Sequence, residues 1–431
     1  MTPANGNTPG AQPRSSARAD AWRIVASRGL RQFAYGLLGV TLAVALTNDG
    51  FSPVAIGALI TIALAGNFVG TYLIGLYADR WGRRRTLVVL AILMALTGAV
   101  YALTRFYPAL ALAAFVGVLG SAASETAPFL PIEQAMLPQT VAPERRTDLF
   151  ARYNLIASFA GALGSLAAAL PDLLARVGVA RPLGLSLMFW VYSACALGVA
   201  WLAARLTPAI EAPVRAGAAE EKARGWRNRL LPPLGASRGI VLRLSGLFSV
   251  DALAGGLVTQ SLLALYFHLR FGASLSLLAA LFFGVNVLSA LSFLAAAPLA
   301  RRFGLLNTMV FTHLPSNALL MLVAFMPSFP LAGGALLLRQ LLSQMDVPTR
   351  QAYTMALVTP KERTAAASVT SLARSVGSGV SPVISGALLT GSLVALGLPL
   401  IIGGGLKAVY DLALWGVFRR VPLPEESARK G

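Results

Sequence analysis

Long apolar stretches, separated by short polar turns, run along almost the whole chain. An α-helix needs about 20 apolar residues to cross the roughly 30 Å of hydrocarbon in a bilayer, and each stretch is close to that length or longer. The stretches lie near residues 30–48, 53–77, 87–105, 108–138, 148–171, 183–204, 240–268, 274–299, 305–326, 329–357, 364–390 and 395–418. The pattern therefore predicts an all-α membrane protein with twelve transmembrane helices.

The composition agrees with this prediction and excludes other classes of protein. Of the 431 residues, 56% are hydrophobic and only 12% are charged, about half the charged fraction of an average soluble domain. A water-soluble core could not bury so much apolar surface, whereas a bilayer covers it from outside. One cysteine, Cys195, and two distant histidines, His268 and His313, offer no disulfide and no metal site with several ligands. We expect no metal and no cofactor.

The distribution of basic residues predicts the orientation in the membrane. Of the 36 Lys and Arg, 28 fall in the tails and turns on one side of the twelve-helix topology, four fall on the other side and four fall within spans. Basic loops stay in the cytoplasm, so both termini are predicted to be cytoplasmic in a multi-pass protein of the cell (inner or plasma) membrane. This bias also accounts for the net charge of +19 without a nucleic-acid partner.

Polar segments divide the chain into five predicted parts. Pro, Ser, Ala and Arg dominate the segment before the first apolar stretch, which favours a disordered tail over a cleaved signal peptide. A second polar and basic segment separates six helices from six. The parts are a disordered cytoplasmic tail (1–29), an N-terminal six-helix bundle (30–205), a cytoplasmic linker (206–239), a C-terminal six-helix bundle (240–418) and a cytoplasmic tail (419–431).

The two halves of the chain contain matching segments in the same order. The matches are Ala-Asp-Arg-Trp-Gly at 78–82 with Ala-Arg-Arg-Phe-Gly at 300–304, Pro-Ile-Glu-Gln-Ala at 131–135 with Pro-Thr-Arg-Gln-Ala at 348–352, and Glu-Arg at 144–145 with Glu-Arg at 362–363. All three offsets are close to 220 residues. We therefore predict two six-helix bundles repeated in parallel, with a site near the midplane between them.

The turn after the second helix, residues 75–85, reads Gly-Leu-Tyr-Ala-Asp-Arg-Trp-Gly-Arg-Arg-Arg. It resembles the loop signature of the major facilitator superfamily. The resemblance implies a secondary transporter that works by alternating access as its two halves rock. It also implies that Asp79 lies against the N-terminus of the eleventh helix, in a cytoplasmic latch formed by Gly75, Asp79, Arg80, Gly82 and Arg83. The alternative for the following arginines is a simple positive-inside anchor.

Ionisable residues within the spans are the candidate functional groups, because a charge in the bilayer costs at least about 2.5 kcal/mol unless it faces a cavity or a partner. We predict that Asp346 and Arg350 form a charged network with Asp251 and Arg374. Arg339 and Glu133 are assigned to the same cavity network. The alternative for each acid is a permanent ion pair that only holds helices together. Lys407 and Asp411, one turn apart on the last helix, are interpreted as a structural pair.

Glu125 is the first candidate for a residue that binds and releases a proton during transport. No basic residue lies within one helical turn of it in the sequence, and Pro128 and Pro131 loosen the helix around it. Asp346 and Asp251 are the other candidates. In each case, the expected coupling ion is the proton.

The leading functional hypothesis is proton-coupled transport, with export favoured, of a small organic solute by a monomer. The fifth helix lacks the glycine–proline core that resemblance to proton-driven exporters would require, since Gly161 and Gly164 have no proline near them before Pro171. The alternatives are uptake or export of an anion, such as a carboxylate or oxyanion, bound by the arginines, and a receptor that transports nothing. An enzyme is excluded, because no catalytic or phosphate-binding motif occurs.

Overall fold

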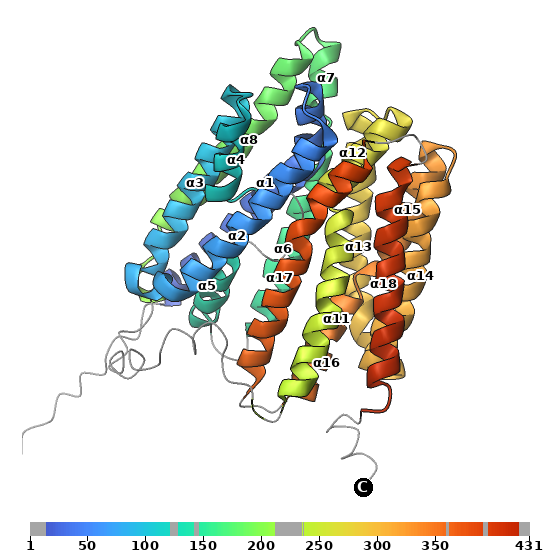
Figure 1. Ribbon diagram of the computed structural model, residues 1–431. Coiled ribbons are helices and arrows are strands. Elements are labelled where there is room, and N and C mark those ends of the chain that lie inside the picture. The colour runs from blue at the N-terminus through green and yellow to red at the C-terminus, as the bar shows by residue number, and fades with distance from the viewer. Residues whose placement is uncertain are drawn as a thin grey trace, which may run out of the picture.

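The computed structural model describes residues 14–120, 128–141, 146–211, 235, 237–358, 362–390 and 395–421. Helices form almost all of this described part, and no strand occurs in it. The prediction of an all-α membrane protein is confirmed (Figure 1).

The first six spans form the N-terminal half. Its helices are α1 (Arg14–Asn48), α2 (Pro53–Trp81), α3 (Arg83–Leu103), α4 (Tyr107–Val116), α5 (Phe129–Met136), α6 (Arg146–Ala167), α7 (Leu170–Arg176) and α8 (Arg181–Ala204), with 3-10 turns at Leu137–Gln139 and Pro208–Ile210. The fourth span comprises α4 and α5, and the fifth comprises α6 and α7.

The last six spans form the C-terminal half. Its helices are α11 (Arg238–Leu257), α12 (Gln260–Phe271), α13 (Leu275–Phe303), α14 (Leu305–Phe325), α15 (Phe329–Ser343), α16 (Asp346–Leu357), α17 (Arg363–Leu388) and α18 (Leu398–Phe418), with a 3-10 turn at Ala395–Gly397. The seventh span is broken between α11 and α12, and the tenth between α15 and α16.

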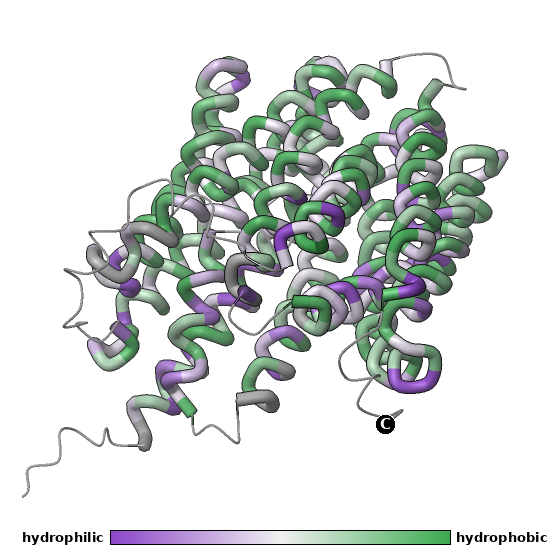
Figure 2. Tube along the Cα trace, turned by 60° about the horizontal axis from the view of Figure 1, so that its bottom comes forward, coloured by the Kyte–Doolittle hydropathy of each residue, from purple (hydrophilic) through white to green (hydrophobic). Residues whose placement is uncertain are grey.

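Nine spans in the described part are long and apolar enough to cross a membrane as continuous segments. The fourth, tenth and eleventh spans do not meet this criterion. The fourth and tenth are divided into shorter helices, and α17 of the eleventh is rich in Ser, Gly and Thr. Most of the length of the helices is hydrophobic (Figure 2). Large exposed side chains such as Leu103 and Leu294 therefore face a surface that lipid can cover.

The internal repeat is visible in matching helix lengths and caps. α2 and α13 each have 29 residues, and α3 and α14 each have 21. Ser52 and Ser274 cap α2 and α13 with their side-chain oxygens. Gly82 and Gly304 end the same two helices with φ values of 96° and 82°, which favour glycine. Each of these two pairs is 222 residues apart, as in the first sequence match.

The expectation of a disordered segment up to residue 29 is wrong for the residues that the structure describes, because α1 begins at Arg14. Asp20 fixes this extension to the end of the sixth span, where it accepts hydrogen bonds from the backbone and hydroxyl of Thr207. Ile24 and Val25 are buried beside it. The sequence suggested disorder because its first turns are polar, but these buried contacts hold them in place.

The two halves contact each other through the ends of their helices that lie away from the chain termini. A side chain at Gly57 would collide with the carbonyl of Pro382, so α2 and α17 cross here with their backbones close together. Asp172 of α7 accepts hydrogen bonds from the backbone N–H and the hydroxyl of Ser276, at 2.8 and 3.0 Å, in the first turn of α13. A carboxylate is thus placed at a helix N-terminus across the two halves.

Candidate functional site

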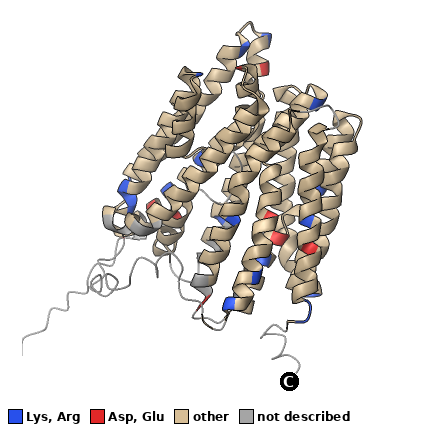
Figure 3. Cartoon of the chain, in the orientation of Figure 1, with Lys and Arg blue, Asp and Glu red and all other residues tan. Residues whose placement is uncertain are grey.

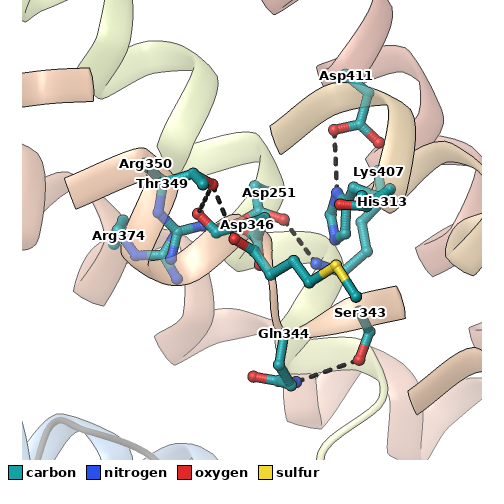
Figure 4. A network of polar contacts seen from close by, with 12 residues as sticks. Asp251, His313, Ser343, Gln344, Asp346, Thr349, Arg350, Arg374, Lys407 and Asp411 are labelled. Atoms are coloured by element: carbon teal, nitrogen blue, oxygen red, sulfur yellow. Dashed lines mark hydrogen bonds and ion pairs between the residues drawn. The ribbon is translucent and has the colours of Figure 1, made fainter. Parts of the chain in front are cut away.

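Several charged residues occur part-way along the helices of both halves (Figure 3). In the C-terminal half they converge on Asp251 of α11, which is 3% exposed. Its carboxylate lies 2.6 Å from Lys407 Nζ, 2.8 Å from Arg374 Nη1 and 3.1 Å from Arg350 Nη1. Arg350 also lies 2.8 Å from Asp346. Helices α11, α16, α17 and α18 are therefore tied together by one network (Figure 4).

The predicted contacts among Asp251, Asp346, Arg350 and Arg374 are confirmed. Arg374 differs from the other three because its side chain is 34% exposed. A solute could therefore contact Arg374 more easily than the other three residues. The sequence missed Lys407, which was paired with Asp411 because of their helical spacing, whereas its ammonium group binds Asp251 on another helix.

Glu133 does not belong to this network, contrary to the sequence-based prediction. It lies on α5 in the N-terminal half, where Arg31 of α1 binds both of its carboxylate oxygens at 2.7 and 2.6 Å. Tyr153 of α6 donates a third hydrogen bond, and the Arg31 guanidinium stacks 4.3 Å from the Phe129 ring. Arg31 and Glu133 are 0% and 1% exposed. This fully buried pair joins the first span to the fourth.

The two ion pairs occupy corresponding places in the repeat with their charges exchanged. Arg31 and Glu133 join the first and fourth spans, while Asp251 and Arg350 join the seventh and tenth. Glu133 and Arg350 are the third residues of the matching Pro-Ile-Glu and Pro-Thr-Arg segments. Each half therefore uses one buried pair between the same two of its spans, although the base comes from the first span in one half and from the fourth in the other.

Two buried arginines have no carboxylate partner among the residues that the structure describes. Arg339 on α15 is 8% exposed, and its Nη1 donates a hydrogen bond to the side-chain oxygen of neighbouring Gln340 at 2.8 Å. Arg28 on α1 is 6% exposed and lies over the ring of Tyr153 at 5.2 Å. The Nε atoms of both arginines are buried without a hydrogen-bond partner in the described structure. No described carboxylate lies within ion-pair distance of either arginine.

A separate polar cluster lies between α14 and α18. His313 Nδ1 is 3.0 Å from Asp411 Oδ1, and the Asn317 amide donates to the other oxygen of the carboxylate at 2.8 Å. All three residues are buried. Asp411 is thus bound to an imidazole and an amide and forms no ion pair with Lys407, so the predicted pair on the last helix is wrong. The spacing of the two residues was correct, but the neighbouring helices decide their partners.

The predicted cytoplasmic latch is only partly described. The side chains at 75, 79 and 80 lie outside the described residues, which leaves the roles of Gly75, Asp79 and Arg80 as predictions. Glu211, which follows the sixth span, accepts hydrogen bonds from the backbone N–H groups of Arg83 and Arg84 at 2.6 and 3.2 Å. In this state Gly82 forms the turn and Arg83 contacts its own half, with Nη1 donating to the carbonyl of Ile210 at 3.4 Å.

Glu125, the first proton-coupling candidate, also lies outside the described residues. Its proposed role stays a prediction. The other two candidates, Asp251 and Asp346, are described, and both bind arginine. A carboxylate held by arginines is a poor carrier of an exchangeable proton, because the neighbouring positive charge favours its ionised form.

The chain is similar to known proteins over most of its length. The family model described as the Major Facilitator Superfamily matches residues 24–382. An uncharacterized membrane protein of Saccharomyces cerevisiae is 27% identical over 421 residues, which cover 91% of this chain and 92% of the yeast protein.

Solved structures with the same fold include several transporters. A mutant of the nucleoside transporter NupG has a TM-score of 0.74 at 15% identity and covers 93% of this chain and 100% of its own. The D-xylose–proton symporter has a TM-score of 0.68 at 17% identity, with 92% and 97% covered. The human organic anion transporter MFSD10 has a TM-score of 0.62 at 18% identity, with 94% and 100% covered. At these identities the structures show the fold alone.

The two ion pairs are expected to respond differently to neutralisation. Glu133→Gln leaves Arg31 buried without a counter-charge, a change that costs about 3–5 kcal/mol. Adding Arg31→Gln should therefore recover part of the lost melting temperature. Asp251→Asn removes the carboxylate that Arg350, Arg374 and Lys407 share. Adding Arg350→Gln should therefore recover little of the lost melting temperature, because two cations still lack this partner. Thermal unfolding of the purified variants in detergent measures both effects, with the half-exposed Arg105→Gln as the control. Strictly additive losses for Arg31 and Glu133 would show that they do not interact.

Proposed function

The chain belongs to the Major Facilitator Superfamily and is a multi-pass secondary transporter, and from this premise we propose that it moves a small organic anion together with a proton. The observation that carries this proposal is the excess of buried positive charge. The buried charged side chains of the described part are six cations and five carboxylates, namely Arg28, Arg31, Arg83, Arg339, Arg350 and Lys407 against Asp20, Glu133, Asp251, Asp346 and Asp411. The partly exposed Arg374 is a seventh cation. An anionic solute would supply the missing negative charge.

Arg339 and Arg28 are the residues best suited to bind the anion. Each is buried, has no ion pair with any described carboxylate and carries an Nε–H group without a partner in the described part of the chain. A guanidinium binds a carboxylate or phosphate through two parallel hydrogen bonds, which a neutral solute cannot match. Arg28 lies on the first span and Arg339 on the tenth, and resemblance to the family places both spans at the central cavity. A solute between the halves would then contact one arginine from each, within a single chain that can work as a monomer.

The coupling to protons follows from the same charges. A proton and an anion attract each other, so a site that takes up one favours the other. The sequence favoured export. The positive interior favours instead co-transport, which runs inward when the outside is more acidic than the cytoplasm. The organic anion transporter among the solved structures agrees with this solute class, but the nucleoside and xylose transporters share the fold equally.

We further propose that the termini face the cytoplasm and that the structure represents a state closed to the outside. The basic residues of the tails and turns support the first point. The contacts between the halves at Gly57, Asp172 and Ser276 support the second, because they lie at the ends of the helices away from the termini. Alternating access then requires these contacts to break.

The solute class is tested by transport in proteoliposomes containing the purified protein. A panel of mono- and dicarboxylates, organic phosphates, sugars, nucleosides and organic cations is screened by counterflow. We expect transport of one or more anions, and a rise in KM of at least about tenfold for Arg339→Gln, since losing one partner of a buried charged contact costs about 2 kcal/mol or more. Arg339→Lys keeps the positive charge but loses the planar guanidinium that donates two parallel hydrogen bonds, so its KM should lie between those of the wild type and Arg339→Gln.

The matched control for Arg339 is Arg301→Gln, because Arg301 is exposed at the end of α13. The control should transport like the wild type. Transport restricted to neutral or cationic compounds, or an anion KM that Arg339→Gln leaves unchanged, would contradict the proposal.

The closed outer side is tested by removing the carboxylate of Asp172. Asp172→Ala loses both hydrogen bonds to Ser276, and hydrogen bonds to a charged group contribute roughly 1.5 kcal/mol or more, so the outward-open population should rise about tenfold. Spin labels at Val177→Cys and Phe325→Cys in a Cys195→Ser background report the distance across this side by pulsed electron resonance. Asp49→Ala, which breaks an ion pair with Arg105 inside one half, is the control. Equal distance distributions in all three proteins would rule out a gating role.

A further inference from the structure

The cluster between α14 and α18 contains two titratable groups, His313 and Asp411, that form no ion pair with the Arg residues of the charged network around Asp251. His313 and Asp411, called here the His–Asp pair, are 2% and 0% exposed, and their atoms Nδ1 and Oδ1 are 3.0 Å apart. The pair lies on the ninth and twelfth spans (Figure 4). It is outside the groups proposed above to bind the solute.

The hydrogen-bonding chemistry of Asp411 differs from that of the other described acids inside the membrane. Glu133, Asp251 and Asp346 are each held by at least one arginine. A guanidinium can only donate hydrogen bonds, so it fits only the ionised acid. Asp411 is held by an imidazole and by the amide of Asn317. Both of these groups can donate or accept, so they can satisfy Asp411 with or without a proton.

Polar atoms around the pair are free to form hydrogen bonds to either protonation state of Asp411. Asn317 Oδ1 and the Tyr410 hydroxyl are buried without a hydrogen-bond partner in the described structure. The Tyr410 ring stands edge-on to the His313 ring with centroids 6.3 Å apart. If the Asn317 amide turns over, its free oxygen faces Asp411 and can accept a hydrogen bond from the protonated carboxyl group. The site therefore has an unused acceptor next to Asp411, whose described partners include no arginine.

Lys407 connects the pair to the charged network. It lies one helical turn before Asp411 on α18, a spacing that places both side chains on the same face. In the structure its Nζ atom is 2.6 Å from Asp251, and it forms no ion pair with Asp411. The other charged or titratable groups near the pair are Tyr410 on α18 and Asp251 on α11. Asp346 and Arg350 on α16 lie near Tyr410.

We propose that the His–Asp pair is the proton-binding site of the transporter and that Lys407 couples it to the solute. With one proton bound, the pair is neutral overall, and Lys407 stays on Asp251 as observed. When the proton leaves, the pair carries one negative charge and draws Lys407 across the helix face to Asp411. Asp251 then depends on Arg350 and Arg374 for its counter-charge. Arg374, which is partly exposed, then contributes less positive charge to the anion held by Arg339 and Arg28, and the anion is released together with the proton.

This inference rests on the proposed function, since a proton site matters for transport only if protons and solute move together. Its first test needs no solute. The chain has two histidines, so protein labelled with ¹³C and ¹⁵N at histidine gives two sets of side-chain NMR signals, and His268→Gln identifies those of His313. We expect the His313 signals to change reversibly as the pH is varied, because the imidazole gains and loses a proton.

Two variants test the partners of His313 in this titration. Asp411→Asn removes the negative charge that holds the proton, so the midpoint should fall by about one pH unit or more. Lys407→Met removes the cation that stabilises the unprotonated pair, so the midpoint should rise by a similar amount. His268→Gln should leave it unchanged. A His313 signal that does not change with pH, or a midpoint that Lys407→Met does not move, would overturn the proposal. The second variant keeps the test decisive if Asp411→Asn does not fold.

A transport assay then separates this inference from the proposed function. His313→Gln should lower accumulation of the anion driven by a pH gradient at least tenfold, while counterflow without a gradient continues. Accumulation equal to the wild type in His313→Gln, with loss in Glu125→Gln instead, would assign the proton to Glu125. If the wild type moves no anion at all, the proposed function fails, whereas the NMR titration still decides whether the pair binds a proton.

Discussion

The arrangement of this protein depends on the cost of placing charge inside a membrane. An ion removed from water must find an opposite charge, a hydrogen-bonding cage or a solute, because hydrocarbon offers none of these. Arg31 and Glu133 meet this requirement completely, with two direct contacts and almost no exposure. Asp251 meets it with three cations from three other helices. These contacts tie α1 to α5 in one half, and α11 to α16, α17 and α18 in the other.

The same constraint gives the site its functional meaning. Both halves use one ion pair between corresponding spans, and both then add an arginine that no described acid neutralises, Arg28 in the first half and Arg339 in the second. An arginine buried in this way destabilises the empty protein unless a partner arrives. A transporter that binds an anion gains affinity because the anion supplies the negative charge that the buried arginine lacks. The anion in turn favours a proton nearby. The His–Asp pair and Lys407 supply a place for the proton and a connection to Asp251.

The sequence predicted the parts of this structure that depend on local pattern or on the repeat. The lengths of the apolar stretches predicted the helices, and the match of Gly82 with Gly304 predicted the repeat that the helix caps confirm. The spacing of Asp346 and Arg350 predicted their contact. Contacts between distant spans were harder to predict, because they depend on how each helix is rotated about its axis. Glu133 was grouped with the charged network of the C-terminal half, although its partner is Arg31, and Lys407 was paired with the wrong acid.

The partners of Arg31 and His313 could not be predicted from the sequence pattern. Arg31 was counted as one more cytoplasmic base, although its partner lies 102 residues away. His313 was set aside because two histidines cannot make a metal cluster, yet one histidine beside a carboxylate is sufficient for a proton site. In both cases the partner is supplied by another span, and the polar residue alone gives no sign of it.

The central claim, that the positive interior binds an anion and a proton together, is tested most directly by measuring the pH inside proteoliposomes. Liposomes containing a pH-sensitive dye start with equal pH on both sides, and the anion identified by counterflow is added outside. The account predicts that the lumen becomes more acidic as the anion enters, and that protein-free liposomes and Arg339→Gln show little change. A lumen that becomes alkaline, or one whose pH stays constant while the anion enters, would contradict it.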